Sequence, residues 1–362
     1  MARRAGAGRG AVTIEDVARL AGVSTATVSR ALAQPDLVRP ETVRLVTEAV
    51  KASGYTPNSS ARSLRRQRTN MVLVVVPTIA NQMYSHVLRG IDTGLAPAGF
   101  GVIIGNLDNA PDKEAHFVDL AFSRQVDGIM LLCGFVPCGR GRSLAETGLP
   151  MVSLCAPIPG ASLPEIHVDD EGAGLEAGRY LAGLGHRRLG YAAGPKGSVV
   201  DQTRWTFFRQ GAIEGGVEPQ DIVRLEGLLE NRFTYGSGLA AAESFLALSN
   251  RPTAMFCASD EIAIGFMKVV RRAGLQVPRD VSLLGFDGIE QADFTEPVLS
   301  TFRQPRHDIG RVGAEVLLQL IEGRRHEGPR ELRLPFELLK RESTAPLPRR
   351  PALRSVTERD GA

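Results

Sequence analysis

The sequence lacks a long apolar run. In a chain of 362 residues, the longest such run near a terminus is Met71–Val76, whereas a membrane-spanning helix needs about 20 apolar residues. The first dozen residues, MARRAGAGRGAV, also lack the apolar segment of a secretory signal. We therefore expect no membrane association and a cytoplasmic location.

Cysteine is scarce, which argues against a disulfide framework and a zinc site. The chain contains only Cys133, Cys138, Cys155 and Cys257. They form no paired CxxC motifs, and no histidine stands at ligand spacing from them. We expect buried free thiols in a reducing compartment, with no metal and no cofactor.

Motifs of common enzymes are absent too: the sequence contains no GxxxxGK[ST], HExxH or GxSxG. The alternative of a nucleotide-dependent enzyme depends on Gly172–Gly178. That segment has the spacing G-x-G-x-x-x-G, not the dinucleotide fingerprint G-x-G-x-x-G. Close helix packing is the simpler role for these glycines.

Positive charge is concentrated at the N-terminus. The formal net charge is only +3, but residues 1–70 hold 12 Arg and Lys against 5 Asp and Glu, a net of +7. The remainder carries −4. A basic head on a mildly acidic body predicts a polyanionic partner for the head alone.

The pattern of residues 13–54 predicts three short helices. Thr13 and Asp16 form a capping-box pattern, Gly22 ends the first helix, and Pro40 opens the third. Two helices joined by a tight turn are typical of the helix-turn-helix, whose second helix enters the major groove of DNA.

The predicted second helix has a polar face suited to DNA. Its members are Thr25, Ala26, Ser29 and Arg30. Arginine can contact guanine with two hydrogen bonds, and short side chains can touch base edges or phosphates. A solvated helix face is the alternative, but the charge of the head favours DNA.

From Met71 onward, strand-like runs alternate with amphipathic stretches. The runs are Val72–Val76, Val102–Gly105, Gly128–Leu132, Met151–Leu154, Ile166–Val168, Leu189–Ala192, Ile222–Leu225, Ala254–Ala258 and Val281–Phe286. The helical stretches include Met83–Leu95, Lys113–Ser123, Gly172–Leu184, Gln202–Ile213, Gly238–Leu248, Ile262–Ala273 and Ile309–Ile321. This alternation predicts parallel sheets covered by helices. The number of strands favours two sheets in two lobes.

Ligands of such sheets bind beyond the carboxyl ends of the strands. The polar candidates there are Asn81, Asn106, Asp169, Asp260 and Asp287, and the aromatic candidates are Tyr84, Trp205, Phe233 and Phe286. Such a set suits a polyhydroxylated ligand, because buried hydroxyls need partners. For each residue the alternative is a structural role, either capping a strand end or packing in the core. For Asp169 and Phe286 we consider this structural role about as probable as a ligand contact.

Several motifs together resemble the LacI/GalR family of bacterial repressors. In the head they are DVARLAGVSTATVSR (Asp16–Arg30), GYTPN (Gly54–Asn58) and ARSL (Ala61–Leu64). In the body they are VPTIANQMYSHVLRGID, RQVDGIML, LGHRRLGYAAGP, PTAMFCASDEIAIG, VPRDVSLLGFDG and LKRES. The similarity runs from about Thr13 to Ser343.

The resemblance implies an all-α helix-turn-helix head and an α/β, two-lobed effector domain of the periplasmic-binding-protein type (type I). The expected divisions are a DNA-binding domain at 13–57, a hinge helix and linker at 58–69, an effector-binding and dimerisation domain at 70–345, and a disordered tail at 346–362. A periplasmic sugar carrier would share the two-lobed fold, but it fits neither the missing signal nor the basic head.

The resemblance also implies DNA contacts. Base readers would be Thr25, Ala26 and Arg30, and backbone contacts would come from Ser24, Thr27 and Ser29. Asn58–Arg65 would be a hinge helix that folds only on DNA, with Leu64 wedged into the minor groove. Eight residues make a marginal helix alone, and an apolar wedge kinks DNA. Arg39 stands where the family often has a helix-capping serine and cannot cap through a side-chain acceptor, so we expect a looser start to the third helix.

The family's effector positions fall on Arg204, Phe233 and Asp287, with Trp205 beside Arg204. Asn81 and Tyr84 lie in a segment most like that of gluconate-type repressors. Cys155 stands where relatives often carry an aspartate, which removes one expected hydroxyl acceptor.

The resemblance implies a regulator of transcription and not an enzyme. We expect a homodimer, with the Met83–Leu95 helix a candidate for its interface, on a pseudo-palindromic double-stranded DNA operator. A sugar or sugar acid would control its affinity, and Arg204 would pair with the carboxylate of the acid. No heptad leucines occur after Pro346, so we expect no tetramer through the tail.

Overall fold

The computed structural model describes residues 12–55, 68–108, 110–227 and 233–347. The chain forms two compact units, one within Met1–Thr69 and the other within Asn70–Ala362. Within the described residues, no helix is long and apolar enough to span a bilayer.

The first unit is a small three-helix bundle. Its helices are α1 (Ile14–Ala21), α2 (Thr25–Ala33) and α3 (Pro40–Ser53), with a short 3₁₀ turn at Pro35–Leu37. Val17, Val28 and Val46, one from each helix, are fully buried and form its core. The predicted end of α1 at Gly22 and start of α3 at Pro40 are confirmed, and so is the capping box of Thr13 at the start of α1.

The turn between α1 and α2 begins at Gly22, whose φ of 67° is left-handed and favours glycine. Arg39 makes no side-chain cap at α3, as its side-chain chemistry predicts, because it carries no acceptor.

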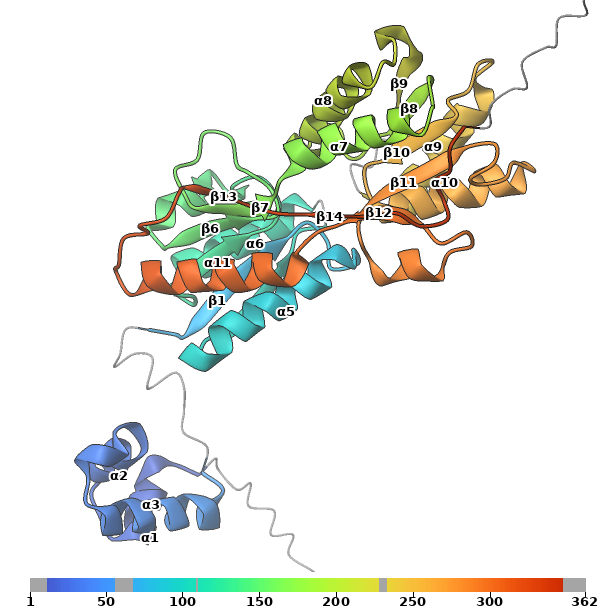
Figure 1. Ribbon diagram of the computed structural model, residues 1–362. Helices are drawn as coiled ribbons and strands as arrows, with labels where there is room; N and C mark the ends of the chain where they lie inside the picture. The colour runs from blue at the N-terminus through green and yellow to red at the C-terminus, as the bar shows by residue number, and fades with distance from the viewer. Residues whose placement is uncertain (1–11, 56–67, 109, 228–232, 348–362) are drawn as a thin grey trace, which may run out of the picture. The chain divides into compact units, whose positions relative to one another are not determined.

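The second unit has two lobes, each built on a six-stranded sheet (Figure 1). The strand order in the first lobe is β13-β7-β6-β3-β1-β2. Their bounds are β1 (Met71–Val76), β2 (Gly101–Asn106), β3 (Gly128–Leu131), β6 (Met151–Leu154), β7 (Glu165–Val168) and β13 (Glu331–Leu334). All neighbouring strands of this sheet are parallel.

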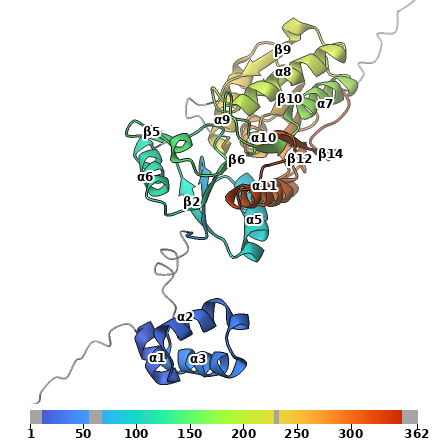
Figure 2. The ribbon, with the colours of Figure 1, turned by 90° about the vertical axis from the view of Figure 1, so that its left-hand side faces the viewer.

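Helices cover both faces of the first sheet (Figure 2). They are α5 (Met83–Leu95), α6 (Pro111–Phe122) and α11 (Arg306–Ile321). Alternate residues of β1 point to opposite faces. Val72 and Val74 pack in the cluster with α5 and α11, whereas Leu73 and Val75 pack with α6. A small hairpin, β4 (Cys138–Gly139) and β5 (Arg142–Ser143), flanks this lobe.

The second lobe has the strand order β14-β12-β11-β10-β8-β9. Its strands are β8 (Leu189–Ala192), β9 (Ile222–Leu225), β10 (Ala254–Cys257), β11 (Ser282–Asp287), β12 (Ser300–Arg303) and β14 (Glu337–Leu339). Its helices are α7 (Asp170–Gly183), α8 (Val199–Glu214), α9 (Tyr235–Ala247) and α10 (Asp260–Arg272). Only β14 runs antiparallel to its neighbour, β12.

The chain passes between the lobes after β7, after β12 and after β13 (Figure 1). The two lobes therefore share one continuous covalent framework. The sequence pattern predicted two sheets, but it did not predict β12, β13 or β14. These strands are three or four residues long, and each begins or ends on a charged residue, so none contains an apolar run long enough to signal a strand.

The four cysteines are unpaired, as predicted. The expectation that all are buried is wrong for Cys138, which is exposed in β4, and Cys133 is half-buried.

Candidate functional site

A cavity of about 400 Å³ lies between the lobes, at the carboxyl ends of their strands. Pro77 follows β1, Cys133 follows β3 and Cys155 follows β6, while Asp287 ends β11 of the other lobe. The cavity is therefore at the crevice where open α/β sheets bind ligands. Its volume is in the range of small-molecule sites.

The structure brings five of the six predicted effector residues to this cavity. They are Asn81, Tyr84, Arg204, Phe233 and Asp287. Trp205 is not among the residues that line it. Its ring packs 5.5 Å from Tyr191 and 6.3 Å from Phe208, measured between ring centroids. The side chain next to Arg204 on a helix points elsewhere, because successive helical residues are about 100° apart.

The remaining candidates from the strand ends have structural roles. Asn106 accepts a hydrogen bond from the Ile79 backbone, and Asp169 caps α7 by accepting one from Gly172 N at 3.1 Å. Asp260 is fully buried and accepts a hydrogen bond from Ile289 N at 2.9 Å. Phe286 is fully buried. None of the four is among the residues that line the cavity, and their polar or apolar requirements are met inside the fold.

Arg204 is the charged centre of the cavity. Its Nε donates to Asp170 Oδ1 at 2.7 Å, and its Nη1 donates to the Ala258 carbonyl at 2.8 Å. The guanidinium carbon lies 3.6 Å from the centroid of the Phe286 ring, a cation–π contact. Only 4% of the residue is exposed. These contacts hold the guanidinium plane in one orientation.

Burial opposes the charge of Arg204, but Asp170 and Asp287 more than offset it, so the pKa of the guanidinium lies above its ordinary value. Burial raises the pKa of Asp170 even though Arg204 opposes that rise. Among the described residues, none donates a hydrogen bond to Asp170 Oδ2. A buried acceptor of this kind favours a hydrogen-bond donor nearby.

Asp287 is the second acid of the site. Its backbone has a φ of 117°, in the region that favours glycine, and only 5% of the residue is exposed. One carboxylate oxygen accepts a hydrogen bond from Gln304 Nε2 at 2.7 Å. Burial raises the pKa of this carboxyl to about 6, although Arg204 opposes the rise. Strain and a perturbed acid in a cleft are typical of functional residues.

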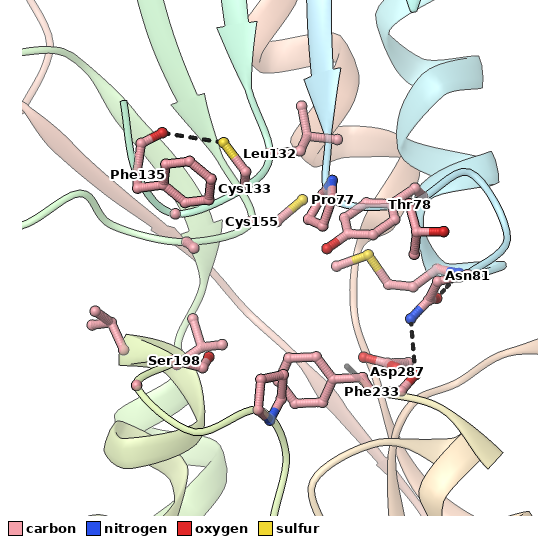
Figure 3. Close-up of a pocket in the computed structure, with 18 of the residues that line it drawn as sticks. Pro77, Thr78, Asn81, Leu132, Cys133, Phe135, Cys155, Ser198, Phe233 and Asp287 are labelled. Carbon is pink, nitrogen blue, oxygen red and sulfur yellow. Dashed lines mark hydrogen bonds between the residues drawn. The ribbon is translucent and has the colours of Figure 1, made fainter. Parts of the chain in front are cut away.

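Several polar side chains at the cavity are already engaged. Asn81 accepts a hydrogen bond from Met83 N and donates one to the Phe233 carbonyl across the lobes (Figure 3). Ser198 caps α8 and Thr234 caps α9. The directional groups that remain for a ligand are concentrated at Tyr84, Arg204 and Asp287.

Sequence reasoning missed Asp170 and the apolar side of the cavity. Asp170 directly follows Asp169 and gives no separate signal in the sequence. The apolar lining includes Pro77, Leu132, Cys133 and Phe135. The strand-end rule points to this edge of the sheet, but an apolar side chain there carries no sequence signal that separates a ligand wall from core.

The glycines of the dinucleotide-like pattern serve helix packing. A Cβ on Gly174 would lie 2.8 Å from the Arg204 carbonyl oxygen, and one on Gly178 would lie 2.3 Å from that of Phe208. Both glycines therefore let α7 approach α8. No group of three or more His, Cys, Asp or Glu that could hold a metal ion occurs in the described part of the chain.

On the first unit, α2 presents the predicted recognition residues. Thr25, Ala26 and Arg30 are exposed. Ser24 caps the helix by accepting a hydrogen bond from Thr27 N at 3.1 Å, and the hydroxyls of these two residues lie 2.8 Å apart. Ser29 is half-buried. The predicted hinge contacts Asn58 and Leu64 lie outside the described residues.

Two family models match the chain. One describes bacterial regulatory proteins of the lacI family and matches residues 13–58. The other describes a periplasmic binding protein-like domain and matches residues 179–344.

Two solved structures resemble the fold over most of the chain. The lac repressor dimer bound to operator and the anti-inducer ONPF has a TM-score of 0.80 and 26% identity, over 93% of this chain and 100% of that one. The complex of the transcriptional regulator CelR with cellobiose has a TM-score of 0.69 and 30% identity, over 92% of this chain and 99% of that one.

Among curated relatives, the transcriptional repressor CytR of Escherichia coli strain K12 is 37% identical over 93% of this chain and 98% of its own length. Catabolite control protein A of Priestia megaterium is 33% identical over 84% of this chain and 91% of its own length. The expected likeness to gluconate-type repressors is not supported. With this identity over nearly the whole length of both chains, the protein belongs to the LacI family of DNA-binding transcriptional regulators.

Proposed function

We propose that the chain is a repressor that binds a pseudo-palindromic DNA operator as a homodimer in the cytoplasm, and that a neutral, polyhydroxylated small molecule in the interlobe cavity controls this binding. The observation that carries the proposal is the presence, in one chain, of a helix-turn-helix with an exposed polar α2 and a ligand-sized cavity centred on Arg204.

The DNA-binding part of the proposal follows from exposure and charge. Val28 and Ala31 bury one face of α2, which leaves Thr25, Ala26 and Arg30 for the major groove. One such helix reads few base pairs, so two copies on an inverted repeat are needed for specificity. The lac repressor is a dimer on its operator, which supports the same assembly here.

The cavity's charges favour a neutral ligand over a sugar acid. Asp170 already pairs with Arg204, and Asp287 adds a second carboxyl beside them. Lys196 also lines the cavity, so a ligand carboxylate would meet two acids and two bases. The charge of Arg204 is already paired with Asp170, so the desolvation of the ligand carboxylate would be poorly compensated. The ribose and cellobiose bound by two related regulators are uncharged sugars, which fits this choice.

Control of DNA binding requires that the ligand bind one state of the body better than another. Such coupling is commonly about 1–3 kcal/mol. We propose that the segment Asn58–Arg65, which includes Leu64, responds to this difference in ligand affinity. A hinge helix of that length would be marginal without DNA, so a small change in the body could decide whether it forms.

Arg30→Ala is expected to lower specific DNA affinity by about 1–3 kcal/mol and to relax the preference at one base pair of each half-site. The control is Arg44→Ala, which removes one exposed charge from α3 and should alter affinity without altering base preference. Competition binding with single-base operator variants measures both. An unchanged base preference for Arg30→Ala would show that Arg30 reads no base.

Arg204→Lys and Leu64→Ala should separate the two activities. Lysine keeps the charge beside Asp170 but loses the planar contacts to Phe286 and Ala258, so ligand affinity should fall at least about tenfold, or 1.4 kcal/mol. DNA binding without ligand should stay within about twofold, since the head is unchanged. Leu64→Ala should show the reverse pattern.

A thermal-shift screen of neutral sugars, sugar acids and nucleotides supplies the ligand, and calorimetry and operator titrations then compare these variants with the surface control Arg279→Lys. If Arg204→Lys responds to the ligand as the parent does, the cavity is not the effector site.

Asp287→Asn should stabilise the protein at high pH. An exposed aspartate has a pKa of about 3.9, whereas that of Asp287 is about 6 in the folded protein. Between these values the folded state binds more protons than the unfolded state, so this group makes stability fall as pH rises, with the full loss reached above pH 6. Asparagine keeps the acceptor for Gln304 without the charge.

The gain should be about 1–3 kcal/mol at pH 8 and should vanish near pH 4. Urea unfolding at both pH values measures it, and Asp308→Asn on the surface of α11 should show no such pH-dependent gain. A variant less stable than the parent at both pH values would contradict the assignment.

A further inference from the structure

Two cysteines lie side by side at the ends of adjacent parallel strands. The register of β3 and β6, continued by two residues beyond their last pair, places Cys133 beside Cys155. The chains are still adjacent one residue further on, because a Cβ on Gly134 would lie 3.3 Å from the Cβ of Ala156. Neighbouring strands are about 4.8 Å apart, so two thiols at matching positions can bind to one common atom.

Both thiols face the same open space. Cys133 and Cys155 line the cavity, and Figure 3 shows both sulfur atoms on one wall of it. The charge of either thiolate would raise the pKa of the same hydroxyl, that of Tyr84. The wall therefore presents two soft sulfur donors to a ligand atom that enters the cavity.

The two thiols are protonated and therefore neutral. Burial raises the pKa of Cys133 to about 12, and its Sγ donates a hydrogen bond to the Phe135 carbonyl at 3.1 Å. Burial, with Asp170 and Asp287 nearby, raises the pKa of Cys155 further above its usual range. A ligand that needs two free thiolates is disfavoured here, whereas a ligand that binds both sulfur atoms without leaving a charge is favoured.

The backbone of Cys155 is unfavourable for a cysteine. Its φ of 68° lies in the left-handed region, which glycine and asparagine adopt more readily than other residues. Conformations of this kind cluster at functional sites. A glycine would remove the strain, so the conformation favours a role for the thiol itself.

We infer that Cys133 and Cys155 form a two-thiol binding site for a trivalent metalloid, of which arsenite, As(OH)₃, is the simplest example. Each thiol proton joins one hydroxyl of As(OH)₃ and leaves with it as water, while an As–S bond replaces an As–O bond. The product, (Cys–S)₂As–OH, is neutral. Arsenic stays trivalent throughout, so the reaction needs no oxidant and no reductant.

The donor set and its charge select a metalloid over a divalent metal. Zn²⁺ prefers four ligands in a closed site and binds thiolates, so it would have to release both thiol protons against their raised pKa values. The described residues offer no group of three or more His, Cys, Asp or Glu for such an ion. Arsenite instead condenses with neutral thiols and adds no charge beside Asp170 and Asp287.

The probes are arsenite and phenylarsine oxide, whose single oxygen leaves as water when its arsenic binds two thiols. Native mass spectrometry of the full-length, reduced protein should show one arsenic per chain, which dithiothreitol removes and a monothiol such as mercaptoethanol does not. Cys133→Ala and Cys155→Ala should each weaken binding at least tenfold. Cys138→Ala is the matched control and should bind within twofold of the parent, because Cys138 is exposed and does not line the cavity.

Cys155→Gly guards against loss of binding through unfolding, because glycine relieves the strained backbone while removing the thiol, and it too should lose the adduct. Three results would overturn the inference: no adduct on the parent protein, an adduct that survives both variants of Cys155, or an adduct that Cys138→Ala removes. The last would place the arsenic on the loop between β3 and β4. None of these results bears on the proposed function, which requires no thiol.

Discussion

The buried ion pair between Asp170 and Arg204 is the interaction on which the effector domain's site depends. Asp170 is the first residue of α7, directly after the chain leaves β7 of the first lobe, and Arg204 lies on α8 of the second. The pair therefore fixes the start of the second lobe against the helix that carries the guanidinium. Gly174 and Gly178 allow the close approach of α7 and α8 that a 2.7 Å contact demands.

Such a pair is costly to bury, and well-packed apolar residues would often stabilise a fold as much. Because stability alone would not require this pair, the cost of burying it is better explained by a role in ligand binding. Asp170 and Phe286 orient the guanidinium, and Asp287, strained and with a raised pKa, stands beside it. A site organised before its ligand arrives loses less freedom on binding. The neutralisation of Arg204 by Asp170 is consistent with the uncharged ligand that we propose.

Much of this was predictable from the sequence where physical signals are local. The capping box at Thr13, the start of α3 at Pro40 and the apolar runs of β6 and β8 follow from caps and from hydrophobic pattern. Asp287 and Phe233 could be placed by the strand-end rule and by family resemblance. The predictions that failed concerned side chains whose roles depend on residues far away in the sequence. Trp205 adjoins Arg204 in sequence but faces Tyr191 and Phe208, and no local signal distinguishes Asp170, which pairs with Arg204, from Asp169, which caps a helix.

A symmetric pair of α2 helices should select a DNA sequence with two-fold symmetry. The measurement is selection of duplexes from a random library by the full-length protein, followed by sequencing of the enriched pool. We expect an inverted repeat of two half-sites at one fixed spacing, because each α2 would read one half-site in the major groove. Recovery of no common sequence, or of isolated single half-sites, would contradict it.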